Sequence, residues 1–235
     1  MTPPLRLTAA HVAQVPPYLG PPQPFDLAGE VATEADHQAL FDQLMRSAPK
    51  QVWVFAYGSL IWNPGFEPAE TRNGHLRGWH RQFCLGWMTI FRGCPERPGI
   101  MLALDRGGSC QGVAQRLGPA RLEADMLSIL RREVPLRRSA YQPRWSPVST
   151  PDGPITALIF PIDRSADNYL QGQSEDAVAH SLATSAGDRG TMAEYLLNTV
   201  QNLQNLGIHD RYLWRLQSAV ADKIERALPA NKEIP

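Results

Sequence analysis

The chain has 235 residues, 43% of them hydrophobic, and its 23 basic residues balance its 23 acidic ones. This length and apolar content predict a globular protein with one sizeable core and exclude a chain that is disordered throughout. The zero net charge gives no reason to expect a nucleic acid or an anionic membrane as partner, and no apolar run approaches the roughly 20 residues of a membrane span.

The first elements are an arm, a helix and a strand. Residues 1–25 hold seven of the 21 prolines, which remove backbone donors and favour extended chain, so we expect an arm that lies on the surface or is disordered. A single domain is expected over residues 26–235. Thr33 is a helix-capping residue, and the apolar spacing behind it predicts a helix that ends near Pro49. Residues 51–56, QVWVFA, predict a strand covered on both faces.

Strands dominate the middle of the chain. "GHLRGWHRQFCLGW" is strand-like, and residues 99–117 predict a hairpin, because two apolar runs flank Asp105-Arg106-Gly107-Gly108. One helix is expected from about Pro119 to about Glu133. Residues 139–148 and 155–162 supply further extended segments.

Three helices are expected from Ser174 onward. The second opens with Thr191 and Glu194 in capping-box spacing and stops at Gly207. Strands with one inserted helix, followed by a helical tail, indicate an α+β fold rather than a regular α/β alternation.

Glu133 stands out on the helix that ends the middle region. On a helical wheel of "ARLEADMLSILRREV", the apolar residues and Glu133 fall within a sector of about 100°. Arg131 and Arg132 point outside this sector. Burial and the helix C-terminus both raise the pKa of a carboxyl, toward the range of a general base. The alternative is that Glu133 pairs with a neighbouring arginine or reaches water at a frayed helix end.

Arginines are concentrated in the same region. From Arg72 to Arg144 there are 13 arginines against five acidic residues. This surplus indicates either a solvated surface or a field that attracts a small anionic substrate. The three cysteines form no C-x-x-C pair and leave an odd thiol, and the N-terminus has no apolar signal-peptide core, so reduced cytosol is the expected location.

Several motifs occur together in a known order: "FAYGSLIWNPGF", "FRGCPERPGIMLALDRGGSCQGVAQRL", "RRE" at a helix end, "AEYL" and "LGIHDRYL". In this respect the chain, from about Val52 to about Leu213, resembles the ChaC-like gamma-glutamylcyclotransferases. It departs from them at Phe91, where many relatives have histidine. The resemblance implies a cytosolic enzyme that cleaves glutathione to 5-oxoproline and cysteinylglycine, on a small mixed β-barrel surrounded by helices.

The resemblance also assigns residues. Glu133 looks like the catalytic glutamate, Phe55 to Leu60 looks like the substrate-binding loop, and Tyr141 looks like the substrate-binding tyrosine. In a γ-glutamyl amide the α-amine closes on the γ-carbonyl, so the enzyme must supply a base, an acid and oxyanion donors. No metal, nucleotide or other cofactor is required.

In this scheme Glu133 moves the proton. The backbone amides of Gly58, Ser59 and Leu60 face carboxylate or carbonyl oxygens. Tyr57 and Tyr141 position the glutamyl end, and Arg92 attracts the glycine carboxylate. The alternative for the loop is a plain turn after a strand, and each of the tyrosines and Arg92 is equally compatible with a packing or surface role.

Other functions have less support in the sequence. Ser59 lacks the G-x-S-x-G setting of a serine hydrolase, and the six histidines show no H-x-x-x-H spacing for a metal. A module that binds glutathione or γ-glutamyl compounds without turnover is the remaining alternative. The oligomeric state is not indicated.

Overall fold

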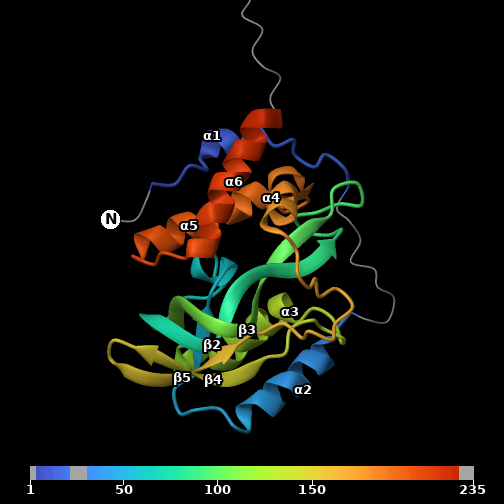
Figure 1. Ribbon diagram of the computed structural model, residues 1–235. Coiled ribbons are helices and arrows are strands. Elements are labelled where there is room, and N and C mark those ends of the chain that lie inside the picture. The colour runs from blue at the N-terminus through green and yellow to red at the C-terminus, as the bar shows by residue number, and fades with distance from the viewer. Residues whose placement is uncertain (1–3, 22–30, 228–235) are drawn as a thin grey trace, which may run out of the picture. The chain divides into compact units, whose positions relative to one another are not determined.

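The computed structural model describes residues 4–21 and 31–227. These residues form two compact units (Figure 1). The barrel unit comprises the described residues 31–82 and 102–169, and the helical unit comprises 4–21, 83–101 and 170–227. Residues 22–30 lie outside the described ranges, so the expected boundary at residue 25 stays a prediction.

Five strands form the barrel. They are β1 (Trp53–Ala56), β2 (Glu70–Met88), β3 (Gly99–Arg116), β4 (Arg144–Thr150) and β5 (Gly153–Ile159). The strand order is β1-β3-β2-β4-β5, and β1 closes the barrel by pairing antiparallel with β3 and parallel with β5. The expected small mixed barrel and the α+β class are therefore confirmed.

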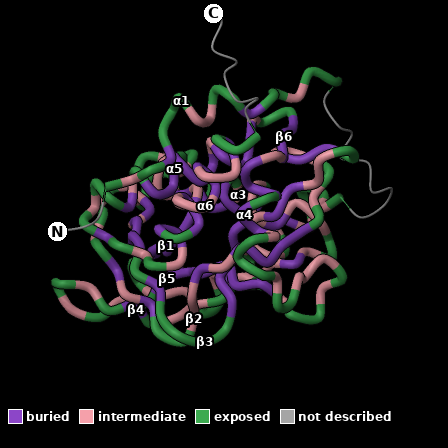
Figure 2. Tube along the Cα trace, turned by 45° about the horizontal axis from the view of Figure 1, so that its top comes forward, coloured by how far each residue is buried: buried purple, intermediate pink, exposed green. Residues whose placement is uncertain are grey.

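Phe55 of β1 is fully buried and packs against glycines of two other strands. β1 is buried at all four positions (Figure 2). A Cβ atom on Gly112 of β3 would lie 2.8 Å from the Phe55 ring, and one on Gly74 of β2 would lie 3.2 Å from it. Both distances are shorter than ordinary carbon contacts, so glycine at these two positions makes room for the aromatic ring.

Two predicted helices of the barrel unit are confirmed. α2 (Glu34–Met45) begins after Thr33, whose side chain and that of Asp36 form a reciprocal capping box. A 3₁₀ turn, η2 (Pro119–Arg121), leads into α3 (Leu122–Glu133). α3 buries Met126, Ile129 and Leu130.

The hairpin predicted for residues 99–117 is wrong, because β3 is one continuous strand. Gly107 and Gly108 have φ angles of +100° and +63°, which glycine adopts readily within an irregular strand as well as in a turn. Asp105 is not an exposed turn residue: its buried carboxylate accepts hydrogen bonds from Arg164 Nε at 2.7 Å and from Tyr169 Oη at 2.9 Å.

The helical unit contains the three helices expected from Ser174 onward: α4 (Glu175–Thr184), α5 (Met192–Asn205) and α6 (Arg211–Ala227). It also contains α1 (Ala9–Val12) and the short pair β6 (Ala186–Gly187) and β7 (Gly190–Thr191). Thr191 caps α5 by accepting from Glu194 N at 3.1 Å. Within the described ranges, none of the helices is long and apolar enough to cross a membrane.

The described part of the proline-rich arm is ordered against α6. Leu7 and Val15 are buried, and the amides of Arg6 and Leu7 both donate to Gln217 Oε1 at 2.8 Å. Arg6 also forms ion pairs with Asp222 and Glu225. Of the two expectations for the arm, a surface location or disorder, the structure supports the first for residues 4–21.

Candidate active site

The loop after β1 carries four of the six residues predicted to bind substrate: Tyr57, Gly58, Ser59 and Leu60. β1 ends at Ala56, and the chain then passes through Tyr57 and Gly58 into a single 3₁₀ turn, η1 (Ser59–Ile61). Gly58 and Leu60 are buried, and Ser59 is half-buried. The predicted change from buried strand to loop therefore lies at the expected residues.

Two buried side chains hold backbone carbonyls of this loop. Arg81 of β2 donates through Nε to the Tyr57 carbonyl at 2.6 Å. Gln115 of β3 donates through Nε2 to the Leu60 carbonyl at 3.2 Å. Both side chains are buried and come from barrel strands, so they tie the position of the loop to the barrel.

The remaining carbonyls of the turn are bound within the loop. The Gly58 carbonyl accepts from Ile61 N at 2.9 Å, and the Ser59 carbonyl accepts from Trp62 N at 3.2 Å and Asn63 N at 2.8 Å. In a planar trans peptide the C=O and the next N–H point to opposite sides. Fixing these carbonyls therefore also fixes the directions of the following amides.

The amides whose directions are fixed in this way are those of Gly58, Ser59 and Leu60. Among residues 4–21 and 31–227, none accepts a hydrogen bond from these three N–H groups. Successive N–H groups without a protein acceptor are suited to bind carboxylate or carbonyl oxygens. The substrate-binding role of these amides stays a prediction, beside the alternative of a plain turn after the strand.

Glu133 is the last residue of α3, and it lies as predicted on the side of the buried apolar residues. Its side chain is 15% exposed. Burial raises the pKa of the Glu133 carboxyl above its usual value, and the positive charge of Arg132 opposes this rise without cancelling it. A carboxyl in this setting is a better proton acceptor than an exposed one.

The helical wheel directs the Cβ atom of Arg132 away from the apolar stripe, but the long side chain of Arg132 reaches Glu133. Arg132 Nε lies 3.2 Å from Glu133 Oε1, and its Nη2 donates to Ser59 Oγ at 2.5 Å. A helical wheel locates Cβ atoms, whereas a long side chain can turn back across the helix surface. Arg131 does point elsewhere, toward Glu34 of α2 at 2.6 Å. Glu133 is therefore both buried, as predicted, and paired with a neighbouring arginine, as the alternative held.

The two predicted tyrosines contact the same segment after β5. Tyr57 Oη donates to the Phe160 carbonyl at 3.4 Å. Tyr141 forms an isolated antiparallel bridge with Ile162, and its Oη donates to the Leu102 carbonyl at 3.1 Å. Both side chains belong to the barrel unit, as do the loop and Glu133.

Arg92 belongs to the helical unit. Its Nη1 donates to Glu194 Oε2 and to the Thr191 carbonyl, both at 2.7 Å, and its guanidinium lies 5.7 Å from the centre of the Tyr195 ring. Glu194 thus pairs with Arg92, although its spacing from Thr191 is that of a capping box. A substrate carboxylate would have to compete with Glu194 for Arg92, so this assignment stays a prediction.

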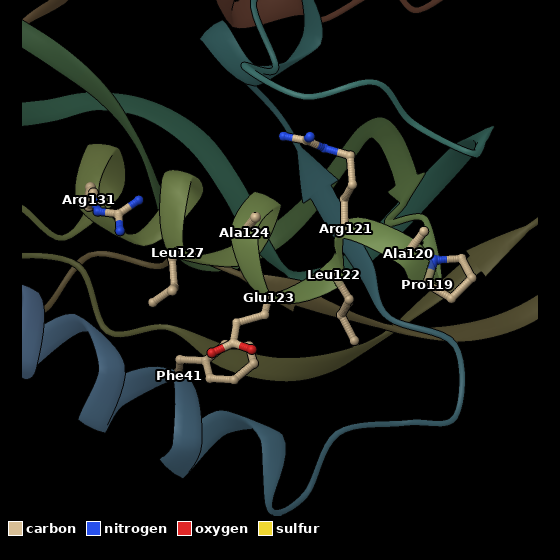
Figure 3. A pocket seen from close by; sticks show the side chains of 9 residues that line it. All are labelled: Phe41, Pro119, Ala120, Arg121, Leu122, Glu123, Ala124, Leu127 and Arg131. Atoms are coloured by element: carbon tan, nitrogen blue, oxygen red, sulfur yellow. The ribbon is translucent and has the colours of Figure 1, made fainter.

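A separate pocket of about 700 Å³ lies between α2 and α3. Figure 3 shows its lining, which comes from η2, from α3 and from Phe41 of α2: Phe41, Pro119, Ala120, Arg121, Leu122, Glu123, Ala124, Leu127 and Arg131. None of the predicted site residues lines it. Within the described ranges no group of three His, Cys, Asp or Glu side chains is arranged to hold a metal ion.

Sequence reasoning missed three side chains that shape the loop: Arg81, Gln115 and Arg132. Two of them carried a signal. Arg81 and Gln115 are polar residues at positions of β2 and β3 that turn out to be buried, and a buried polar side chain in a strand needs a hydrogen-bond partner. The partner itself, a carbonyl far along the chain, is not indicated by any local pattern.

Comparisons with known proteins agree on one family. The sequence model of the ChaC-like proteins matches residues 52–223. A glutathione-specific gamma-glutamylcyclotransferase of Escherichia coli is 39% identical over 160 residues, which is 68% of either chain. The mouse glutathione-specific gamma-glutamylcyclotransferase 1 is 31% identical over 190 residues, covering 78% of this chain and 82% of that protein.

The fold has a solved counterpart. The crystal structure of a yeast gamma-glutamylcyclotransferase specific to glutathione superimposes with a TM-score of 0.66 at 18% identity, covering 74% of this chain and 97% of the yeast chain. At this identity the likeness shows a shared fold. The sequence match extends from the strand before the loop, through Glu133, into the last described helix. The chain therefore belongs to the ChaC-like protein family.

Proposed function

We propose that this protein is a glutathione-specific gamma-glutamylcyclotransferase, a lyase that converts glutathione to 5-oxoproline and cysteinylglycine. The observation that carries the proposal is the Glu133 carboxyl, buried and with a raised pKa, on a helix tied to a loop with three free amides. Membership of a family whose relatives bear this activity in their names points to the same substrate.

The reaction balances without water or a cofactor. The α-amine nitrogen of the glutamyl group forms a bond to its own γ-carbonyl carbon, which closes a five-membered lactam, and the bond from that carbon to the cysteine nitrogen breaks. The attacking nitrogen enters as an ammonium and ends as the lactam N–H, so it loses two protons, and the departing nitrogen gains two because cysteinylglycine leaves with an ammonium group. Intramolecular attack gains much of its rate from orientation once the substrate is held in the folded rotamer.

Glu133 is assigned the proton transfers. Its raised pKa makes the carboxylate a stronger base toward the ammonium and the resulting acid a ready donor to the leaving nitrogen. The amides of Gly58, Ser59 and Leu60 are assigned the glutamyl carboxylate or the oxyanion that develops on the γ-carbonyl. Tyr57 and Tyr141 position the glutamyl end, and Arg92 is assigned the glycine carboxylate.

The proposal includes a cytosolic location. Cys84, Cys94 and Cys110 are buried and none of them forms a disulfide, as expected for a protein of a reducing compartment.

The deciding experiment incubates the purified protein with glutathione and quantifies 5-oxoproline, cysteinylglycine and glutamate by mass spectrometry. Equimolar 5-oxoproline and cysteinylglycine are expected. Glutamate in place of 5-oxoproline would identify a hydrolase instead. Glutathione binding by calorimetry without any product would identify the non-catalytic binding module.

A further inference from the structure

We propose that Arg132 is a positioning residue that fixes Glu133 relative to the substrate loop and sets the pH range in which Glu133 acts as a base. Three groups meet its guanidinium. Nε lies 3.2 Å from Glu133 Oε1, Nη2 donates to Ser59 Oγ at 2.5 Å, and Nη1 donates to the Asn63 carbonyl. The inference rests on the proposed function, since it assigns a role within that reaction.

The geometry suits a bridge rather than a simple ion pair. The guanidinium is planar, and its donors point outward in a fixed fork. Binding Ser59 and Asn63 on one side and Glu133 on the other therefore fixes both the distance and the direction between the carboxylate and the loop amides. All of these residues lie in the barrel unit, and the Arg132 side chain is 27% exposed.

Arg132 also acts through its charge. It favours the ionised form of Glu133, against the larger effect of burial. Two carboxylates of α2 form ion pairs with arginines at or just beyond this end of α3: Glu34 with Arg131 at 2.6 Å and Asp36 with Arg137 at 2.9 Å.

The uncharged and titratable neighbours complete this environment. His37 of α2 lies with Nε2 at 3.0 Å from the Val134 carbonyl, one residue beyond Glu133. On the loop side, Ser59 accepts the hydrogen bond from Arg132. Among the described residues, Arg132 is the cation that forms an ion pair with the Glu133 carboxylate.

The bridge and the charge can be separated by two substitutions. Arg132→Lys keeps the positive charge but loses the fork, so the loop is no longer held at a fixed distance from Glu133. Arg132→Gln removes the charge and shortens the side chain, so both roles are lost. Neither substitution should disrupt α3, because both glutamine and lysine are good helix formers.

The two variants should therefore differ in their pH profiles. For Arg132→Gln the acid limb of kcat should move to higher pH, because a carboxylate without its cation has a higher pKa, and the loss of kcat should be about tenfold larger at pH 6 than at pH 8. For Arg132→Lys the acid limb should stay close to that of the wild type, while KM for glutathione rises about tenfold through the misplaced loop.

Arg131→Gln is the matched control. It removes a neighbouring arginine of the same helix, whose partner is the exposed Glu34, and it should leave both the acid limb and KM unchanged. Melting temperatures of all variants establish that each is folded. If Arg132→Gln does not fold, Arg132→Lys alone decides through KM.

The inference is overturned if both Arg132 variants keep the wild-type acid limb and KM, or if Arg131→Gln changes them equally. A wild-type protein that forms no 5-oxoproline would instead refute the proposed function itself. Active wild-type enzyme with unchanged Arg132 variants refutes only the role of Arg132, so the two failures are distinguishable.

Discussion

Replacing Glu133 by glutamine tests the assignment of the proton transfers directly. The amide has the size of the carboxyl and keeps some hydrogen bonding, but it cannot accept the ammonium proton. Turnover should therefore fall by about 10² to 10⁴, the usual contribution of a positioned acid or base. The fold should be retained, because the side chain is 15% exposed and glutamine fits the same space.

The effect on stability has a definite sign. The pKa of Glu133 is raised above its usual 4.5 by burial, so the protonated form favours folding at low pH and this contribution is lost as the pH rises through the folded value. Each unit of the rise amounts to about 1.4 kcal/mol at neutral pH. A neutral glutamine does not bear this cost, so the variant should melt at the same temperature as the wild type or higher at pH 7. Its advantage should shrink toward pH 4.5 and below.

The assay measures 5-oxoproline release and thermal melting between pH 4.5 and 8. Glu123→Gln is the control, because Glu123 is exposed on the same helix and accepts a hydrogen bond only from Gln38 among the contacts given by the structure. It should change neither rate nor pH dependence. A Glu133→Gln protein that melts early yet turns over at close to the original rate would remove this residue from the mechanism.

Three further predictions concern substrate, metal and the arm. Simple γ-glutamyl amino acids should be poor substrates, as the relatives' names indicate, and equal turnover of glutathione and γ-glutamyl-alanine would contradict this specificity. EDTA should leave activity unchanged, because the reaction needs no Lewis acid, and a loss that a divalent ion restores would refute the proposal of a metal-free mechanism. Removing residues 1–25 should preserve kcat, since Glu133 and the loop lie in the barrel unit, but should lower the melting temperature. The truncation removes the buried side chains of Leu7 and Val15, each of which stabilises the fold by about 1.5–3 kcal/mol. A folded but inactive truncation would show that the arm shapes the site.

Local signals were enough to predict the helices α2 to α6, whereas α1 (Ala9–Val12) lies in the arm that was expected to be extended or disordered. The side chains of Thr33, Ser174 and Thr191 each accept a hydrogen bond from a backbone amide in the first turn of a helix. This interaction depends only on residues three positions apart. The same holds for the position of Glu133, which follows from helical periodicity.

Predictions failed where distant residues decide the outcome. The residues around Gly107 resemble a turn, but Asp105 is held by Arg164 and Tyr169, which lie 59 and 64 positions along the chain. The direction of Arg132 depends on Ser59, 73 positions away. Such contacts exist only once the barrel has closed, and no pattern in the sequence specifies them.

The anchoring of the loop carbonyls has a thermodynamic consequence for ligand binding. Arg81 and Gln115 immobilise the backbone when the protein folds, so the entropic cost of ordering the amides belongs to the free energy of folding and is absent from that of binding. A substrate then meets donors that are already preorganised. Sequence changes at Arg81 or Gln115 that leave the barrel intact would restore loop entropy, and they would weaken affinity without removing any atom that touches the substrate.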